Sequence, residues 1–189
     1  MLSHLRPSLI LFIFFMLLTG VAYPLFMTGS AQVLFPSMAN GSLVIENGTV
    51  RGSHLIGQSF ATDRYFWPRI SAAGSGYDAG ASSGANLGPT SKKLLDRIAA
   101  DAQRVKAANR VQSLPPDAVT ASASGLDPDI SPAYAALQVA RVAKARNVGE
   151  DKVRTLVDAH VKWPLLGIFG EPRVNVLALN RALDAMVPG

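Results

Sequence analysis

A run of small hydroxyl residues followed by two aspartates carries most of the polar chemistry in the middle of this sequence. The run reads VTASASGLDPDISPAYAALQ and spans residues 119–138. Ser122, Ser124 and Gly125 form a serine–glycine cluster of the kind that can contact a phosphate group through hydroxyl and backbone donors. The cluster has no lysine, and no clear helix N-terminus follows it directly. It therefore predicts a nucleotide contact at most, without the groups that normally hold a phosphate.

The two aspartates of this run, Asp127 and Asp129, lie on either side of a proline. Carboxylate oxygens at this spacing can share a cation, although two carboxylates alone make a weak metal site. They can equally belong to a surface loop that meets another protein. We therefore predict no metal site here and keep partner binding as the functional interpretation of the two aspartates.

The same stretch also has a purely structural interpretation. Gly125 can adopt the positive φ of a tight turn, and the proline after Asp127 favours an extended backbone before it. Ser131 occupies the position of an N-cap, and Pro132 the first position of a helix. Asp129, just before that N-terminus, would interact favourably with the helix dipole. On this interpretation the stretch begins a helix and performs no chemistry.

Two further turns combine glycine, proline and polar side chains. One reads Gly-Glu-Pro-Arg and the other reads Asn-Leu-Gly-Pro. Rigid polar turns of this kind on a small domain indicate a docking surface rather than a pocket. The predicted partner-binding residues are Asn86, Gly88, Gly125, Asp127, Asp129, Glu171 and Arg173.

Several common catalytic and binding motifs are absent from the sequence. It has no G-x-x-x-x-G-K-[ST] phosphate loop and no aspartate-lysine-threonine-glycine phosphorylation signature. There is no cysteine, and His4, His54 and His160 lack the spacing of metal ligands. We therefore predict no catalytic residues and no bound metal. A serine–histidine–aspartate arrangement that includes His160 stays open as an alternative, although no pattern points to it.

The most apolar part of the sequence lies near its start. Residues 9–27 read LILFIFFMLLTGVAYPLFM, 19 residues without a charge, of which 14 are Leu, Ile, Phe, Val or Met. A helix of this length extends about 28 Å, close to the hydrocarbon thickness of a bilayer. We therefore predict a transmembrane helix at 9–27. The alternative is a cleavable signal peptide, for which residues 28–31 supply small side chains, although the apolar run is longer than the usual ~7–15 residues.

The charges beside this segment predict its orientation. Arg6 precedes it, whereas no charged residue follows it until Glu46. The positive-inside rule then places residues 1–8 in the cytoplasm and residues 28–189 outside it. The formal net charge of +5 is typical of basic residues spread over exposed helix faces. An extracytoplasmic location also removes nucleic acid as a natural partner.

The exported part is predicted to combine strands and helices in an α+β or mixed α/β domain. Paired strands flank the turn dipeptide Asn47-Gly48, and a short strand is expected at 119–121. A segment rich in glycine, serine and alanine over 63–91 predicts a long loop, whose aromatic residues 65–67 need partners in the core or on another subunit. Hydrophobic spacing and capping residues predict helices over 91–111, 132–146, 150–161 and 176–186, the last of them capped by Asn175.

Three longer motifs carry a resemblance to a known family. They read SSGANLGPTS at 82–91, VTASASGLDPDISPAYAALQVARVA at 119–143 and LGIFGEPRVNVLALNRALD at 166–184. In this order they closely resemble the C subunit of the Kdp potassium-transporting ATPase, the KdpC family. The resemblance extends from the apolar segment to the last helix, which is essentially the whole chain.

The resemblance implies a single-pass protein of the bacterial inner membrane with a larger soluble domain. Such a subunit assembles with a channel-like potassium-binding subunit, a P-type ATPase subunit and a small membrane peptide, surrounded by membrane lipid. The complex imports potassium with high affinity by hydrolysing ATP, so ATP and potassium are handled by the complex and this chain binds no cofactor firmly. The resemblance also implies a role in assembly and as a "catalytic chaperone" that raises the ATP affinity of the ATPase subunit.

Three functions follow from these expectations. The leading one is a non-catalytic subunit that caps or braces the potassium-binding subunit from outside the cytoplasm. The second is a membrane-tethered extracytoplasmic enzyme, and the third is a direct ATP-binding module. Direct contact between cytoplasmic ATP and Ser122, Ser124 or Gly125 would require the orientation opposite to the one that the flanking charges predict.

Overall fold

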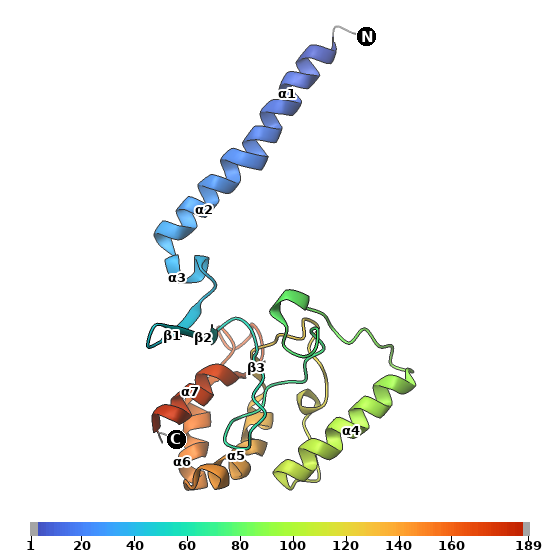
Figure 1. The fold of residues 1–189 in the computed structure, drawn as a ribbon, viewed down its shortest axis with the longest axis vertical. Coiled ribbons are helices and arrows are strands. Elements are labelled where there is room, and N and C mark those ends of the chain that lie inside the picture. Colours follow the sequence, from blue (N-terminus) through green and yellow to red (C-terminus); the bar gives the residue numbers. More distant parts are fainter. Residues whose placement is uncertain (1–3, 187–189) are drawn as a thin grey trace. The chain divides into compact units, whose positions relative to one another are not determined.

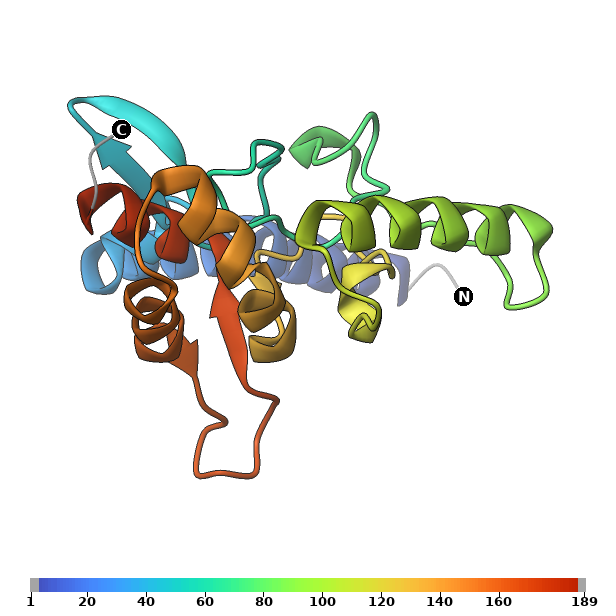
Figure 2. The same cartoon turned by 90° about the horizontal axis from the view of Figure 1, so that it is seen from below.

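The computed structural model describes residues 4–186, and the chain divides into two compact units (Figure 1 and Figure 2). The first unit is Met1–Arg51 and the second is Gly52–Gly189. The first contains a long apolar helix, and the second combines helices with a small sheet. The predicted fold class, one apolar N-terminal helix plus an α+β region, is therefore confirmed.

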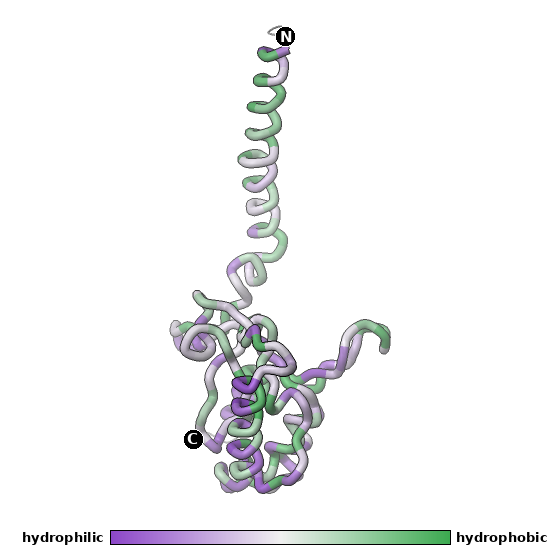
Figure 3. Tube along the Cα trace, turned by 90° about the vertical axis from the view of Figure 1, so that its right-hand side faces the viewer, coloured by the Kyte–Doolittle hydropathy of each residue, from purple (hydrophilic) through white to green (hydrophobic). Residues whose placement is uncertain are grey.

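The first unit begins with a helix whose side chains are largely apolar. α1 (Leu5–Leu17), a π-helical turn (Leu18–Ala22) and α2 (Tyr23–Leu34) follow one another without a break. Together they form 30 residues that are long and apolar enough to cross a membrane. Figure 3 shows hydrophobic colouring along most of this helix. The helix extends beyond the predicted segment 9–27 at both ends.

The π-helical turn within this helix has a local cause. Pro24 lies two residues after the turn and has no N–H to donate to it. Its ring also crowds the backbone one turn earlier. A wider turn before the proline relieves both conflicts, so the hydrogen-bond pattern changes without ending the helix.

A short helix and a two-stranded hairpin complete the first unit. They are α3 (Pro36–Ala39), β1 (Leu43–Glu46) and β2 (Thr49–Ser53), whose last residues lie in the second unit. The two residues between the strands, Asn47 and Gly48, have φ values of 51° and 75°. Positive φ at both positions is what a two-residue type I′ turn requires. The predicted pair of strands is therefore confirmed.

Four helices form most of the regular secondary structure of the second unit. They are α4 (Lys92–Asn109), α5 (Pro132–Arg146), α6 (Glu150–Ala159) and α7 (Val176–Met186). α5 packs against both α4 and α6, and α6 packs against α7. The four predicted helices are thus confirmed, with ends that differ by at most two residues.

Two of these helices begin at the capping residues that the sequence indicates. The Oγ of Ser131 accepts a hydrogen bond from the N–H of Tyr134 at 3.0 Å, and Pro132 is the first residue of α5. The side-chain oxygen of Asn175 accepts from the N–H of Ala178 at 3.0 Å. Each cap satisfies a backbone donor that the first turn of a helix leaves unpaired.

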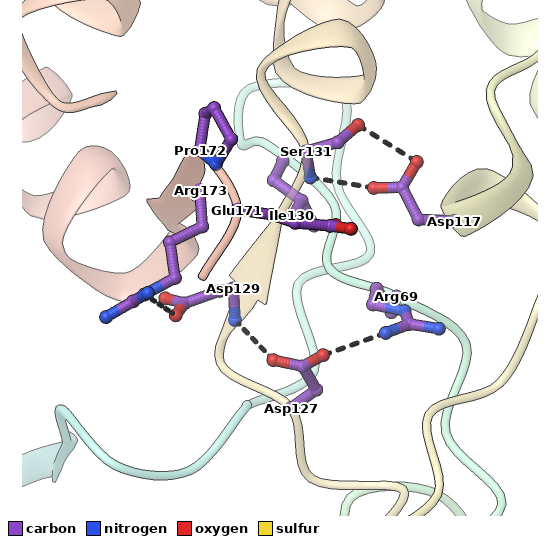
Figure 4. A pocket seen from close by; sticks show the side chains of 9 residues that line it. All are labelled: Arg69, Asp117, Asp127, Asp129, Ile130, Ser131, Glu171, Pro172 and Arg173. Atoms are coloured by element: carbon purple, nitrogen blue, oxygen red, sulfur yellow. Dashed lines mark hydrogen bonds and ion pairs between the residues drawn. The ribbon is translucent and has the colours of Figure 1, made fainter. Parts of the chain in front are cut away.

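Three short strands form an antiparallel sheet in the order β3–β5–β4. They are β3 (Asp129–Ile130), β4 (Val161–Lys162) and β5 (Arg173–Asn175). Because β5 is central and antiparallel to β3, the turn that precedes β5 lies beside the end of the short strand β3 (Figure 4). Figure 2 shows that the segment between β4 and β5 forms a hairpin extending away from the helices. The sheet thus brings two of the three predicted polar turns together.

The segment between β2 and α4 has little regular secondary structure, as predicted. A short 3-10 helix at Ala79–Ala81 is its one helical turn. Side chains hold the rest of the loop in place: the Oγ of Ser71 accepts from the N–H of Tyr77 at 2.7 Å, and the Tyr77 hydroxyl donates to the carbonyl of Arg69. The loop is therefore ordered by hydrogen bonds rather than by strand pairing.

The prediction of a short strand at 119–121 is wrong. The residues before it form a 3-10 helix over Pro116–Ala118, and Ala121 makes only an isolated parallel bridge to Ile70. Proline at the start of the 3-10 helix favours a turn. The chain then turns again at Gly125, which has a φ of 69°, before a strand can extend.

Of the aromatic residues at 65–67, Phe66 and Trp67 belong to the core of the second unit, and Tyr65 is half-buried. Phe66 is fully buried, and its backbone N–H and carbonyl pair with the side-chain amide of Asn180 in α7, at 2.8 and 3.0 Å. The amide of Gln138 in α5 pairs in the same way with the backbone of Trp67, at 2.7 and 3.1 Å. Both amides are themselves buried. They take the place of a neighbouring strand and hold the loop against the helices.

Two buried arginines of α5 fix the backbone just before this pair. Arg141 donates to the carbonyl of Tyr65 at 3.1 Å, and Arg146 donates to the carbonyl of Arg64 at 2.8 Å. The guanidinium of Arg141 also lies 4.1 Å from the centre of the Trp67 ring, within cation–π range. The arginines satisfy carbonyls that the loop cannot pair by itself.

The buried phenol of Tyr134 predicts a specific sensitivity to alkaline pH. Tyr134 is 2 % exposed, and burial raises the pKa of its hydroxyl to about 12. In the unfolded chain a tyrosine has a pKa of about 10. Between these two values the unfolded chain releases a proton that the folded chain retains, so stability is lost as the pH rises.

We therefore expect the unfolding temperature to fall less steeply above pH ~10 in Tyr134→Phe than in the unmodified chain. Thermal unfolding at a series of pH values between 8 and 11, followed by circular dichroism, measures this difference. The two proteins should have parallel profiles below pH ~9, because there the phenol is protonated in both states. Parallel profiles over the whole range would contradict the expectation.

Candidate functional site

The second unit has a shallow charged depression where the loop before β3 meets the turn before β5. Its volume is about 240 Å³, and Figure 4 shows the side chains that line it. We refer to these residues as the charged cluster. They are Arg69, Asp117, Asp127, Asp129, Ile130, Ser131, Glu171, Pro172 and Arg173.

Asp127 connects the loop between β2 and α4 to the turn before β3. One carboxylate oxygen accepts from a guanidinium nitrogen of Arg69 at 2.9 Å, and the other accepts from the N–H of Asp129 at 3.0 Å. The Asp127 and Arg69 side chains are about three-quarters buried. Partial burial reduces screening by water, so this pair is stronger than an exposed ion pair.

Asp129 forms a second ion pair, across the sheet. A carboxylate oxygen lies 3.0 Å from the Nε of Arg173, and the other accepts from the side-chain amide of Asn175 at 3.2 Å. Asp129 and Asn175 are direct partners in the register of β3 and β5. The pairing therefore fixes Arg173 at the point where the turn enters the sheet.

Asp117 ties the 3-10 helix to the start of α5. Its carboxylate accepts from the N–H of Ser131 at 2.7 Å and from the Ser131 hydroxyl at 3.0 Å. The same hydroxyl oxygen accepts from Tyr134 as the N-cap of α5. The serine is thus held from both sides, and its hydroxyl is not available as a nucleophile.

The cluster contains four carboxylates and two guanidinium groups, which is a formal net charge of −2. Three of the carboxylates have the partners described above. Within the described part of the chain, the carboxylate of the exposed Glu171 is the one in this cluster without a hydrogen bond or an ion pair. Glu171 is therefore the acidic group that a partner can contact without first breaking an internal interaction.

The geometry of the cluster favours recognition over catalysis. Its ionic and hydroxyl groups mainly hold three segments of chain in fixed positions. Among residues 4–186, no group of three or more His, Cys, Asp or Glu side chains is placed to hold a metal ion. What the arrangement offers is a rigid, net acidic surface with one free carboxylate, which suits a partner with basic groups.

Four of the predicted partner-binding residues meet in the cluster: Asp127, Asp129, Glu171 and Arg173. Asn86 and Gly88 do not line it; both are exposed in the loop before α4. A partner contact at these two positions stays a prediction and would belong to a different part of the surface.

The predicted nucleotide residues have internal roles in the structure. The Oγ of Ser124 accepts from the N–H of Leu126 at 3.1 Å, and the Ser124 carbonyl accepts from the N–H of Ser83 at 3.0 Å. Ser122 is buried. Gly125 packs so closely that a Cβ would lie 2.7 Å from backbone atoms of a neighbouring segment. A nucleotide contact here stays a prediction, and binding would compete with these interactions.

Two members of the cluster, Arg69 and Asp117, were missed by the sequence analysis. Arg69 lies 58 residues before the aspartate that it pairs with, and Asp117 lies 14 residues before Ser131. Neither belongs to a turn with glycine, nor to a motif with known chemistry. Only the folded chain brings these residues to the site, so no local pattern could have identified them.

Comparison with known proteins gives matches over the whole chain. A family model described as KdpC, K+-transporting ATPase, c chain, matches residues 5–185. The "Potassium-transporting ATPase KdpC subunit" of Caulobacter vibrioides is 58 % identical over 189 residues, covering 100 % of this chain and 96 % of that protein. The proteins of the same name from Methylobacterium nodulans and Rhodopseudomonas palustris strain BisB5 are 54 % and 52 % identical, each covering 98 % of both chains. This chain therefore belongs to the KdpC family, the c chain of potassium-transporting ATPases.

Proposed function

We propose that this chain is a non-catalytic accessory subunit of an ATP-driven, high-affinity potassium importer. The apolar helix anchors it in the membrane, and the second unit is needed to assemble and stabilise the complex. One observation carries the proposal: the polar residues that could act chemically are already held in hydrogen bonds and ion pairs within the chain. Ser131, Asp117, Asp127 and Asp129 all serve to fix the chain, whereas Glu171 stays accessible.

The second unit, in this proposal, lies outside the cytoplasm. Support comes from Arg6 before the apolar helix and from the absence of charge between that helix and Glu46. The unit then braces the channel-like potassium-binding subunit and does not contact cytoplasmic ATP. Potassium and ATP are handled by that subunit, the P-type ATPase subunit and the small membrane peptide. Any effect on the ATP affinity of the ATPase subunit would be transmitted through the assembled complex.

Deletion of this chain is expected to abolish growth at micromolar potassium in a strain that depends on the pump. Without the accessory subunit, the remaining subunits should fail to co-purify as a stable complex. The measurements are growth at limiting potassium and the yield of the tagged complex in detergent. Re-expression of the intact chain is the control and should restore both. Unimpaired assembly and growth without the chain would overturn the proposed function.

The orientation can be measured with a single introduced cysteine, because the chain has none of its own. Gly88 is a suitable position, since it is exposed and a Cβ added there meets no atom within 4 Å. Gly88→Cys in intact cells should react with a membrane-impermeant thiol reagent. Reaction only after lysis would place the second unit in the cytoplasm and would favour the direct ATP-binding module instead.

A further inference from the structure

The hairpin between β4 and β5 exposes five large apolar side chains within seven residues. Figure 2 shows this hairpin extending from the second unit, and in Figure 3 an arm of the unit ends in hydrophobic residues. We refer to residues 163–169 as the hairpin tip. The exposed side chains are Trp163 (74 %), Leu165 (71 %), Leu166 (79 %), Ile168 (76 %) and Phe169 (65 %).

Exposure on this scale is unusual for a domain surrounded by water. Single exposed apolar residues are common, but a contiguous group of them marks an interaction site. Elsewhere in the described part of the second unit, exposed large apolar side chains occur singly, as Leu55, Leu95 and Met186 do. The hairpin tip is therefore a distinct surface and is separate in character from the charged cluster at its base.

The backbone of the hairpin tip satisfies most of its own hydrogen bonds. The N–H groups of Gly167, Ile168 and Phe169 donate to carbonyls within the tip at 3.0 to 3.2 Å. The N–H of Leu165 donates to the carbonyl of Phe169 at 3.2 Å, and Pro164 has no N–H to satisfy. The tip can therefore leave water with few unpaired backbone donors, which lowers the cost of its desolvation.

Strand pairing and an ion pair also hold the hairpin in one conformation before any partner binds. At its base, Val161 pairs with Val174 and Lys162 with Arg173 in the sheet. The Asp129–Arg173 ion pair adds a further link to β3. A prearranged hairpin loses little conformational entropy on binding, so more of the apolar contact contributes to affinity.

Charge at the base decides which occupant fits the hairpin tip. The charged cluster has a net charge of −2, and the exposed Lys162, directly before the tip, reduces the charge at the base to −1. The charge of Arg173 is balanced by Asp129. Glu171, free and exposed, lies two residues after the end of the tip. Bacterial membrane surfaces with anionic lipids would repel such a base. A protein groove with an apolar floor and basic groups at its rim is complementary to both features.

We propose that the hairpin tip inserts into an apolar groove with a basic rim on another subunit of the potassium pump. This proposal rests on the accessory-subunit role, because the groove belongs to a second protein of the same complex. The aliphatic and aromatic side chains of the tip act as the central anchors of the interface. Glu171 and the charged cluster supply the polar rim around them.

Leu166→Asp and Ile168→Asp, each made in the full-length chain, test the anchors. Each should reduce the yield of co-purified complex by about tenfold or more, because a buried charge would replace a central apolar contact. The matched control is Leu95→Asp on α4, where leucine is 59 % exposed, and it should leave the yield unchanged. Unfolding temperatures of all three variants should stay near that of the unmodified chain, since the substituted side chains face solvent. Undiminished yields with the tip variants would overturn the proposal.

The occupant can be identified with a photoreactive benzophenone attached to Ile168→Cys in the assembled complex. Illumination should cross-link this position to one other pump subunit, whereas the same reagent at Leu95→Cys should not. Brominated lipids provide the alternative test, because they quench tryptophan in contact with acyl chains. Strong quenching of Trp163 in the complex, or cross-links to lipid alone, would show insertion into the bilayer and overturn the proposal.

The failure of this proposal differs from the failure of the proposed function. If deletion of the chain prevents assembly but the Asp variants of the tip do not, only the hairpin assignment is wrong. If deletion leaves the complex intact, the accessory role itself is wrong. The deletion strain and the tip variants, measured side by side with the same tagged subunit, therefore separate the two conclusions.

Discussion

Replacing Arg141 with methionine is expected to destabilise the second unit by about 3–5 kcal/mol, because it leaves several buried acceptors unpaired at a cost of ~1–3 kcal/mol each. The Arg141 side chain is 4 % exposed. It donates to the side-chain oxygens of Asn109 at 3.0 Å and Gln138 at 2.6 Å. It also donates to the carbonyls of Asp63 and Tyr65 at 2.8 and 3.1 Å. Methionine fills a similar volume but removes a donor from each of these four acceptors, of which the Gln138 oxygen keeps another, the N–H of Trp67.

The charge of Arg141 persists at neutral pH although the side chain is buried. Burial lowers the pKa of Arg141 to about 10, which is still far above 7. Desolvation therefore makes the charged group less favourable in the folded state, and its hydrogen bonds offset that cost. Its contact with the ring of Trp67, at 4.1 Å, adds a cation–π contribution of ~1–2 kcal/mol at such a buried site.

Urea unfolding of the full-length chain in detergent, followed by tryptophan fluorescence, measures the Arg141→Met effect. Trp67 lies against the guanidinium in the core and reports loss of this packing. Arg104→Met is the control, because Arg104 also faces the Trp67 ring but is 59 % exposed and 5.6 Å away. It should change the stability by less than about 0.5 kcal/mol. Equal stabilities for the two variants would contradict the role assigned to the buried network.

Replacing Gly125 with alanine is expected to destabilise the second unit by about 2–4 kcal/mol, the sum of left-handed strain and displaced backbone. The φ of Gly125 is 69°, a conformation that alanine adopts at a cost. A Cβ would lie 2.7 Å from the backbone nitrogen of Ala73 and 2.7 Å from the carbonyl oxygen of Ser83. Both neighbours are backbone atoms, so neither can rotate away as a flexible side chain would.

Gly88→Ala is the matched control for Gly125→Ala. An added Cβ at Gly88 meets no atom within 4 Å, and no positive φ is recorded there. Alanine should therefore change the stability by less than about 0.5 kcal/mol. Thermal unfolding of both variants, followed by circular dichroism, gives the comparison. If Gly125→Ala were as stable as the control but altered ATP-dependent activity, the predicted nucleotide contact would gain support over the structural role.

The sequence was sufficient to predict the elements whose stabilising contacts lie within a few residues. The apolar run 9–27 predicts a long helix because its length and lack of charge leave few alternatives in a membrane. Asn47-Gly48 predicts the first hairpin because both residues tolerate positive φ. Ser131 and Asn175 predict helix starts because each cap involves a donor only three residues away.

Part of the candidate site was also predictable. The turns that contain Asp127, Asp129, Glu171 and Arg173 stand out by their mixture of glycine, proline and charge. Their convergence in one cluster could not be read from the sequence. It depends on the antiparallel pairing of β3 with β5, two strands of two and three residues that carry almost no periodic signal.

The sequence by itself determined that this chain has one long apolar helix, a capped set of helices after it and three polar turns, because those features follow from contacts within a few residues. Only the tertiary structure decided what surrounds each side chain. It buried Phe66 against the amide of Asn180 and brought Arg69 to Asp127, 58 residues away. It also left the apolar hairpin tip in solvent, although its composition alone would favour a place in the core. Burial is a property of the packed chain, and no local pattern of residues specifies it.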